Sequence, residues 1–279
     1  MEQIPFIKMH GLGNDFVIID GRTRLPNLSV GALRAIADRH RGVGYDQLIV
    51  MEPTQNDADI FMRIYNADGS ESEACGNATR CVAQLLMVET GKDTVIIETL
   101  GGLLSGTTDG NDGMVIDMGK PNLGWQQIPL ACEEDTAHVR IKAGPLSDPV
   151  AVNMGNPHAV FFVEDAESID LEKWGPQLET NPIFPERANI SIASKMENGD
   201  FRLRVWERGV GITLACGSAA CATMVAANLR GLAGGSATLL LNGGPLDMHL
   251  SDDGHVHMGG PVATSYHGVL DQSLLKGTA

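Results

Sequence analysis

The apolar positions of this chain fall in short alternating runs separated by Gly-rich turns, which predicts many strands and few helices. The first run crosses a Gly-containing turn at 11–14 and predicts two strands that end near Asp20. Helical spacing of apolar residues predicts helices at about 31–41, 75–90, 171–178 and 216–231, and Gly91 closes the second in a favoured position. Further strands are expected at 47–51, 60–65, 94–98, 114–118, near Val139, 150–154, 159–163, 189–193 and 201–206, with two more before 258–261.

One strand–turn–helix pattern occurs twice. RIYNADGSESEACGNATRC begins at Arg63, and RVWERGVGITLACGSAAC begins at Arg204. The spacing stays constant up to the Ala-Cys-Gly of each copy, because 204 − 63 and 216 − 75 are both 141. Shorter matches extend the repeat to either side: Met9 with Met154 (offset 145) and 118–121 with 258–261 (offset 140). Because these matching positions occur in the same order in both parts of the chain, they indicate an internal duplication.

The duplication predicts the fold class, α+β with two pseudo-symmetric halves. We expect each half to be a curved, mostly antiparallel and barrel-like sheet around one central helix, with the active site in the cleft between the halves. The first half is expected to comprise residues 1–120 together with a returning tail, 264–279, and the second half residues 121–263.

Composition narrows the classes of partner. The 279 residues are 43% hydrophobic and 20% charged, and no apolar run approaches the ~20 residues of a membrane span. A net charge of −15 argues against nucleic acid and favours a small-molecule ligand. Charged residues such as Lys8 and Asp15 interrupt any signal peptide, so we expect a cytoplasmic protein without a membrane partner. The five cysteines are odd in number and lack metal-ligand spacing, so neither a disulfide framework nor a metal site is expected.

Two cysteines stand where chemistry is expected. Cys75 and Cys216 each begin a predicted helix, where backbone N–H groups and the helix dipole favour an anion, either a thiolate or a bound carboxylate. Such surroundings can lower a thiol pKa from about 8.5 to roughly 3.5–7.5. Two thiols on opposite sides of one carbon could invert a stereocentre, because one removes the proton and the other delivers one. The remaining three, Cys81, Cys132 and Cys221, are expected to be small buried hydrophobes.

Four motifs together carry a resemblance that covers nearly the whole chain. They are KMHGLGNDF, NADGSESEACGNATRC, MGNPHAVFF and WERGVGITLACGSAAC. The sequence resembles diaminopimelate epimerase. The resemblance implies a cofactor-free homodimer that interconverts LL- and meso-diaminopimelate on the route to lysine and peptidoglycan.

The resemblance also implies roles for individual residues. In the LL-to-meso direction it makes Cys216 the accepting base and Cys75 the proton donor, with His158 and Glu207 tuning the thiols. The carboxylate at the reacting centre is expected at the helix starts, Gly76, Asn77, Gly217 and Ser218. The remaining substrate contacts are expected at Asn14, Gln47, Asn66, Asn156, Asn189, Glu207 and Arg208.

Side-chain chemistry supports part of this assignment. A second amino-acid end needs a guanidinium for its carboxylate, for which Arg208 is suited. Glu207 and Asn66 are suited to its ammonium. The asparagines could instead form turns, and His158 could be an ordinary strand-end residue. A Schiff-base role for Lys8 is also conceivable, but no phosphate-binding Gly loop accompanies it.

Two positions depart from the family pattern. Ala78 stands where a Gly is usual, and Ile212 stands where a Glu is frequent, which leaves the loop conformation at Ile212 open. Alternative readings are a proline-racemase-like enzyme, a cysteine hydrolase or transferase with one nucleophilic thiol, and a binding module without activity. The matched pair, Cys75 and Cys216, favours the two-thiol epimerase over these alternatives.

Overall fold

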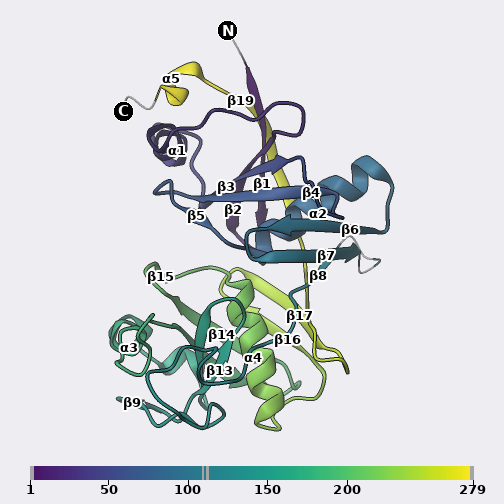
Figure 1. Ribbon diagram of the computed structural model, residues 1–279. Coiled ribbons are helices and arrows are strands. Elements are labelled where there is room, and N and C mark those ends of the chain that lie inside the picture. The colour runs from purple at the N-terminus through teal and green to yellow at the C-terminus, as the bar shows by residue number, and fades with distance from the viewer. Residues whose placement is uncertain (1–2, 109, 111–112, 277–279) are drawn as a thin grey trace. The chain divides into compact units, whose positions relative to one another are not determined.

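The computed structural model describes residues 3–108, 110 and 113–276 and is dominated by strands (Figure 1). The helices are α1 Val30–Ala37, α2 Gly76–Thr90, α3 Leu171–Glu179, α4 Gly217–Leu229 and α5 Gln272–Leu275, with a short 3-10 turn η1 Ala166–Ser168. The strands before residue 120 are β1 Ile4–Gly11, β2 Asn14–Asp20, β3 Gln47–Glu52, β4 Ile60–Asn66, β5 Glu71–Ser72, β6 Thr94–Thr99, β7 Gly102–Thr108 and β8 Met114–Asp117. The later strands are β9 Lys142–Ala143, β10 Leu146–Ser147, β11 Val150–Asn153, β12 Pro157–Phe162, β13 Asn189–Lys195, β14 Phe201–Glu207, β15 Gly211–Ile212, β16 Ser236–Leu241, β17 Gly244–Leu250, β18 Val256–Gly260 and β19 Ala263–Leu270.

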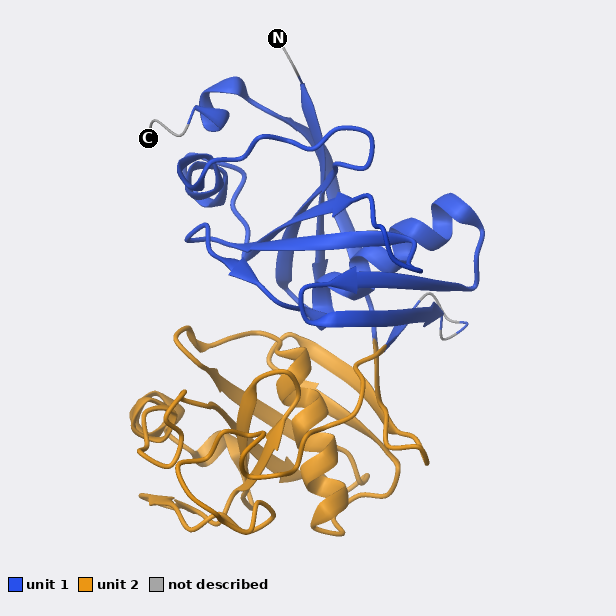
Figure 2. Ribbon diagram, viewed as in Figure 1, with its two compact units in different colours: residues 1–116, 260–279 blue, residues 117–259 orange. Residues whose placement is uncertain are grey.

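The chain divides into two compact units (Figure 2). The first contains residues 1–116 and 260–279, and the second contains residues 117–259. The boundaries expected from the sequence, after 120 and after 263, lie four residues further along the chain at both junctions (120 − 116 and 263 − 259). Residues 277–279 of the expected tail lie outside the described residues.

In the first unit the strands pair in the order β19, β1, β2, β3, β4, β6 and β7. Two pairs are parallel, β2 with β3 and β4 with β6, and the others are antiparallel. The central helix α2 contacts β1 and β2 as well as β6 and β7, which lie far apart in this order. The sheet therefore curves around the helix. β19 runs antiparallel to β1, from Ile4 opposite Leu270 to His10 opposite Ala263.

The second unit repeats this pairing strand for strand. Its order is β11, β12, β13, β14, β16 and β17, followed by β18. Its two parallel pairs are the counterparts of those in the first unit: β12 with β13 corresponds to β2 with β3, and β14 with β16 corresponds to β4 with β6. The short strands β5 and β15 pair with the ends of β4 and β14 in the same way. The duplication and the two-half α+β fold are thereby confirmed. Helix α4 contacts strands near both ends of the strand order, β11 and β12 as well as β16 and β17, so this sheet also curves around its helix. Apolar residues surround α4 on nearly all sides, which is typical of a buried helix.

Each sheet also packs an outer helix on its other face. In the first unit α1 buries Leu33 and Ile36 against Val17 and Leu48 of the sheet. In the second unit α3 buries Leu171 and Leu178 in a cluster that includes Phe161 and Ile190. Alternation along β12 and β13 places one set of side chains toward α4 and the other toward this cluster, because successive side chains point to opposite faces.

Two expectations from the sequence need correction, and one strand was missed. The strand near Val139 is wrong, because Val139 is a core residue in irregular backbone whose N–H donates to the Pro149 carbonyl (3.0 Å). The helix expected to reach residue 41 ends at Ala37. There the Asp38 carboxylate accepts from the backbone N–H groups of His40 (2.8 Å) and Arg41 (2.9 Å), a local alternative to further helical bonds. Strand β7 is not predicted, because its Gly, Ser and Thr residues resemble a turn.

Gly91 ends α2 as expected, and its conformation makes a test. Its φ is 69°, in the left-handed region, and its N–H donates to the Met87 carbonyl (2.8 Å). A Cβ there would meet nothing within 4 Å, so Gly91→Ala should lower the free energy of unfolding by about 1 kcal/mol through backbone strain alone. Urea unfolding measures this loss. The matched control is Gly234→Ala, also in open space but without a left-handed φ, and it should change stability by less than about 0.5 kcal/mol. Equal stability of both variants would contradict the prediction.

Candidate active site

Both expected cysteines are N-cap residues. Cys75 caps α2 with φ −151° and ψ 104°, and Cys216 caps α4 with φ −128° and ψ 107°. In each case the Cys carbonyl accepts the first intrahelical bond, from Thr79 N (2.9 Å) and from Ala220 N (3.1 Å). The backbone N–H groups before that bond, including those of the two residues after each Cys, point out of the helix start, where the dipole favours an anion. Cys75 is half-buried and Cys216 is 7% exposed.

The expected residues divide between the two units. The first unit carries Asn14, Gln47, Asn66, Cys75, Gly76 and Asn77. The second unit carries Asn156, His158, Asn189, Glu207, Arg208, Cys216, Gly217 and Ser218.

In the first unit the Asn14 side chain is fixed from two sides. Its Oδ1 accepts from Asn77 Nδ2 (3.1 Å), and its Nδ2 donates to Asp46 Oδ2 (2.9 Å). Asp46 also accepts from Asp15 N (3.0 Å) and from Arg39 Nη2 (2.6 Å), so its carboxylate is itself anchored. The orientation of the Asn14 amide is therefore set before any ligand binds, with one N–H left to donate.

A second amide pair lies at the adjoining strand ends. Gln47 and Asn66 are opposite each other in the register of β3 and β4, and Gln47 Nε2 donates to Asn66 Oδ1 (3.0 Å). Asn66 Nδ2 donates in turn to Ser70 Oγ (3.1 Å) in the turn before Cys75. Gln47 Oε1 is buried and finds no hydrogen-bond donor among the described residues. It is an acceptor that a ligand ammonium could satisfy.

His158 is fully buried in the second unit, and its ring is uncharged at neutral pH. Burial, together with the charge of Arg208, lowers its pKa to about 3. Its Nε2 lies 2.6 Å from Asn156 Oδ1, which accepts, so the proton sits on Nε2. Nδ1 is then an acceptor, buried and without a hydrogen-bond donor among the described residues. The ring can accept a hydrogen bond from a thiol but cannot supply positive charge to a thiolate.

Two other expected residues, Asn189 and Arg208, meet just after the end of β14. Asn189 is 3% exposed, and its Oδ1 accepts from Arg208 N (2.9 Å) while its Nδ2 donates to the Pro157 carbonyl (3.2 Å). Arg208 Nη1 donates to the Glu186 carbonyl (3.0 Å). The guanidinium is exposed, and no described Asp or Glu pairs with it, so its fork remains able to bind a carboxylate.

Two residues of this site were missed in the sequence. Asp46 orients Asn14, and Thr213 Oγ1 donates to Glu207 Oε1 and so fixes that carboxylate. Asp46 precedes the expected substrate contact Gln47, and Thr213 follows Ile212, and this adjacency is the signal that could have found them. Their partners lie on other strands or across a turn, and the sequence alone does not show such contacts. At the start of α4, Cys216 Sγ lies 3.6 Å from Ser218 Oγ.

The other cysteines contrast with the capping pair. Cys81 and Cys221 are fully buried inside α2 and α4, as expected, and burial raises the pKa of the Cys81 thiol to about 12. Cys132 is exposed, so the expectation that it is a buried hydrophobe is wrong. The apolar neighbours in its sequence, Leu130 and Ala131, do not predict this, because only Leu130 is directed into the core.

The two departures from the family pattern are accommodated. Ala78 is fully buried within the first turns of α2, where Ala favours the helix. Ile212 forms the short strand β15 opposite Trp206, so the loop conformation is regular without a Glu at this position. Lys8 is buried beside Asp15 and also donates to the Gly44 carbonyl, which accounts for it as a structural ion pair.

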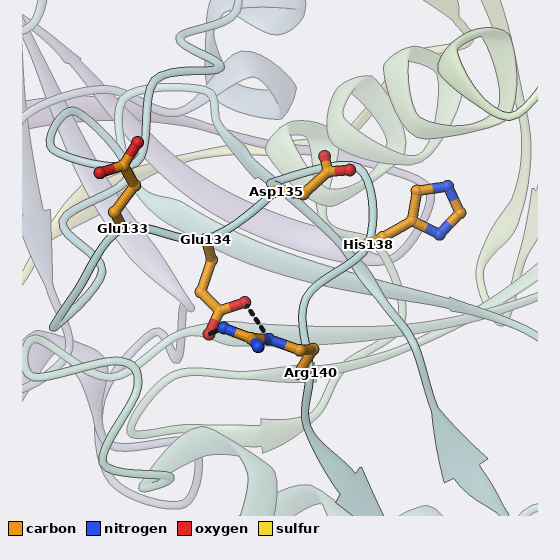
Figure 3. A pocket seen from close by; sticks show the side chains of 5 residues that line it. All are labelled: Glu133, Glu134, Asp135, His138 and Arg140. Atoms are coloured by element: carbon orange, nitrogen blue, oxygen red, sulfur yellow. Dashed lines mark hydrogen bonds and ion pairs between the residues drawn. The ribbon is translucent and has the colours of Figure 1, made fainter.

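A surface hollow elsewhere in the second unit contains none of the expected residues. Glu133, Glu134, Asp135, His138 and Arg140 line it (Figure 3). Its guanidinium, on Arg140, is held by both oxygens of Glu134 at 3.0 Å and is thus already paired. Among the described residues, no group of His, Cys, Asp and Glu is placed to bind a metal, and no helix has the length and apolar content needed to cross a bilayer.

Solved structures share this duplicated fold. A hydroxyproline epimerase from Agrobacterium vitis, solved with bound trans-4-hydroxy-L-proline, matches with a TM-score of 0.68 at 15% identity, over 99% of this chain and 95% of that one. A PhzF-family phenazine biosynthesis protein from Bacillus anthracis matches with a TM-score of 0.69 at 15% identity, over 97% and 100%. The fold is thus that of the PhzF-like and proline-racemase-like proteins.

Sequence comparison places the chain within this class. A family model described as diaminopimelate epimerase matches residues 6–124 and 150–264. Diaminopimelate epimerases from Rhodospirillum centenum (54% identical, over 98% of this chain and 94% of that protein) and Acidiphilium cryptum (53%, over 97% and 98%) are similar over nearly the full length. The chain belongs to the diaminopimelate epimerase family. The resemblance drawn from its motifs and the expectation of an epimerase are confirmed.

Proposed function

We propose that this protein interconverts LL- and meso-diaminopimelate by proton transfer at one α-carbon, with Cys75 and Cys216 as the two acid–base groups. The observation that carries the proposal is the matched pair of N-cap cysteines on repeated strand–turn–helix units in a chain of this family. The product would supply lysine and peptidoglycan precursors. No cofactor takes part in the proposed reaction.

In the LL-to-meso direction the Cys216 thiolate takes the α-proton, and the electron pair of the broken C–H bond remains on the substrate, shared with its carboxylate. The Cys75 thiol then gives its proton to the opposite face, so that Cys216 ends as a thiol and Cys75 as a thiolate. The reaction requires both sulfurs to reach the same carbon. The N–H groups at the two helix starts, at Gly76, Asn77, Gly217 and Ser218, would hold the carboxylate and stabilise the charge that develops on it.

The distal amino-acid end of the substrate would be read by charged and amide groups. Arg208 would bind the distal carboxylate through its exposed fork, and Glu207 and Asn66 would accept from the distal ammonium. Their orientation is supported by the fixed contacts to Asn189, Thr213 and Gln47. Asn14, Gln47, Asn156 and Asn189 would complete the set of substrate contacts. His158, as a neutral acceptor, would tune a thiol by hydrogen bonding rather than by charge.

Incubation with LL-diaminopimelate in deuterated water tests the function. As the isomer ratio moves toward equilibrium, one deuterium should enter at the inverted α-carbon, because the donor thiol exchanges its proton with solvent. Mass spectrometry and chiral chromatography follow label and isomer together. A fixed isomer ratio without label would rule the proposal out, and a covalent acyl-enzyme would indicate a hydrolase or transferase instead.

We also propose that the protein is a homodimer, as the family implies. Light scattering on the full chain should give twice the mass of one chain at micromolar concentration. A monomer mass at the concentration that supports full turnover would contradict this.

A further inference from the structure

A buried carboxylate holds the turn that carries Arg208. Glu179, the last residue of α3, is 6% exposed, and its two oxygens accept from different donors. Oε2 accepts from the indole Nε1 of Trp206 (2.7 Å), and Oε1 accepts from the backbone N of Gly209 (3.0 Å). Arg187 Nη1 approaches Oε1 at 3.5 Å. These donors and this charge offset the desolvation of the buried carboxylate.

The two contacts of Glu179 lie on either side of Glu207 and Arg208 in the chain. Trp206 precedes Glu207 and Arg208, and Gly209 follows them, so Glu179 joins the residues on either side of this pair. The indole also packs directly on α3: a Cβ at Gly175 would lie 2.6 Å from two of its ring atoms. The helix, the indole and the turn are therefore held as one unit.

The preceding peptide of the turn is held by a second buried side chain. Asn189 Oδ1 accepts from Arg208 N (2.9 Å), one residue before the N–H that Glu179 accepts. Successive N–H groups at 208 and 209 are thus anchored from β13 and from α3. With its backbone fixed at both peptides, Arg208 has mainly its own side-chain torsions left to adjust.

In the first unit the equivalent turn is also held by the outer helix, but there the helix side chain donates the hydrogen bond instead of accepting it. There the outer helix α1 supplies Arg34, whose Nε donates to the carbonyl of Asp68 (2.8 Å), in the turn between β4 and β5. In both units an outer helix therefore holds the turn that leads to the capping cysteine. Only the second-unit brace uses a buried carboxylate, and only that turn carries the arginine suited to a ligand carboxylate.

We propose that Glu179 is a positioning residue that sets Arg208 for the distal carboxylate of the substrate. This inference rests on the proposed function. In Glu179→Gln the amide keeps one oxygen acceptor but loses the other, so either Trp206 Nε1 or Gly209 N is left without one. The KM for LL-diaminopimelate should then rise about tenfold, because a displaced Arg208 makes a weaker hydrogen bond to the distal carboxylate of the substrate. The kcat should change by less than about twofold.

Hydrogen exchange and matched variants separate this role from simple stabilisation. Exchange in peptides covering 206–212 should quicken in Glu179→Gln, because either the Gly209 amide or the Trp206 indole loses its acceptor and the turn is held by one contact fewer. Glu172→Gln makes the same chemical change at an exposed position of α3 and should leave KM and exchange unchanged. In a Trp206→Phe background, which removes the indole donor, the same Gln substitution should raise KM by less than in the wild type, because one oxygen then suffices.

The outcomes are distinct. Faster exchange with a wild-type KM would show that Glu179 only stabilises the turn and would overturn the positioning role. Unchanged exchange and unchanged KM would overturn the brace itself. If the wild-type protein fails to epimerise diaminopimelate, the proposed function fails, and the exchange measurement still decides whether Glu179 holds the turn.

Discussion

Cys75→Ala and Cys216→Ala should each lower kcat for epimerisation by about a thousandfold or more, within the range that a positioned acid or base contributes. Each variant keeps one thiol and loses the group that must act on the opposite face of the α-carbon, so inversion stops. The remaining thiol can still exchange a proton on its own face. In deuterated water, Cys75→Ala should therefore introduce label into supplied LL-diaminopimelate without inversion, and Cys216→Ala should introduce label into supplied meso-diaminopimelate without inversion.

The other cysteines provide the controls for this experiment. Cys132→Ala removes an exposed thiol, and Cys81→Ala removes one that is fully buried and has its pKa raised to about 12, so neither should change kcat by more than about twofold. If either capping-cysteine variant kept a tenth of wild-type turnover, a two-thiol mechanism could not stand. Loss of activity in only one of them would favour a single nucleophilic thiol.

Arg208→Leu should raise the KM for diaminopimelate by about a hundredfold, because hydrogen bonds to a charged group are worth about 1.5–3 kcal/mol each and the exposed fork can make two. Arg208→Lys keeps the charge but loses the fork, so its KM should rise by about tenfold. The effect belongs in KM rather than kcat, because the distal carboxylate is bound equally in the ground state and the transition state. Initial rates over a range of substrate concentrations measure both.

Arg140→Leu is the matched control, since it removes the same charge from the same unit at the hollow shown in Figure 3. Its KM should match that of the wild type. If Arg208→Leu also kept the wild-type KM, the assignment of the distal carboxylate to Arg208 would be wrong. A fall in kcat with an unchanged KM would instead place Arg208 nearer the reacting centre.

The residues of the site differ in how far their state and position can be predicted from the sequence. The capping position of Cys75 and Cys216 follows from a local pattern, a short strand and a Gly-rich turn before an apolar helix, and both are N-caps in the structure. The state of His158 follows from no local pattern. Its pKa depends on complete burial and on the charge of Arg208, which is 50 residues away in the chain (208 − 158). Glu179 is equally invisible, because its partners Trp206 and Gly209 lie on other elements.

Four features can be inferred from the amino-acid sequence without a structure: the duplicated architecture, the family, the helices that start at the two cysteines and the end of α2 at Gly91. These depend on periodicity, turn residues and repeated spacing, which neighbouring residues carry. The tertiary structure alone decided which strands pair, that Val139 is core rather than strand, that Cys132 is exposed, and which acceptors fix Asn14, Glu207 and the Arg208 turn. Those features depend on partners brought together by folding, whose contacts and desolvation no local stretch of sequence contains.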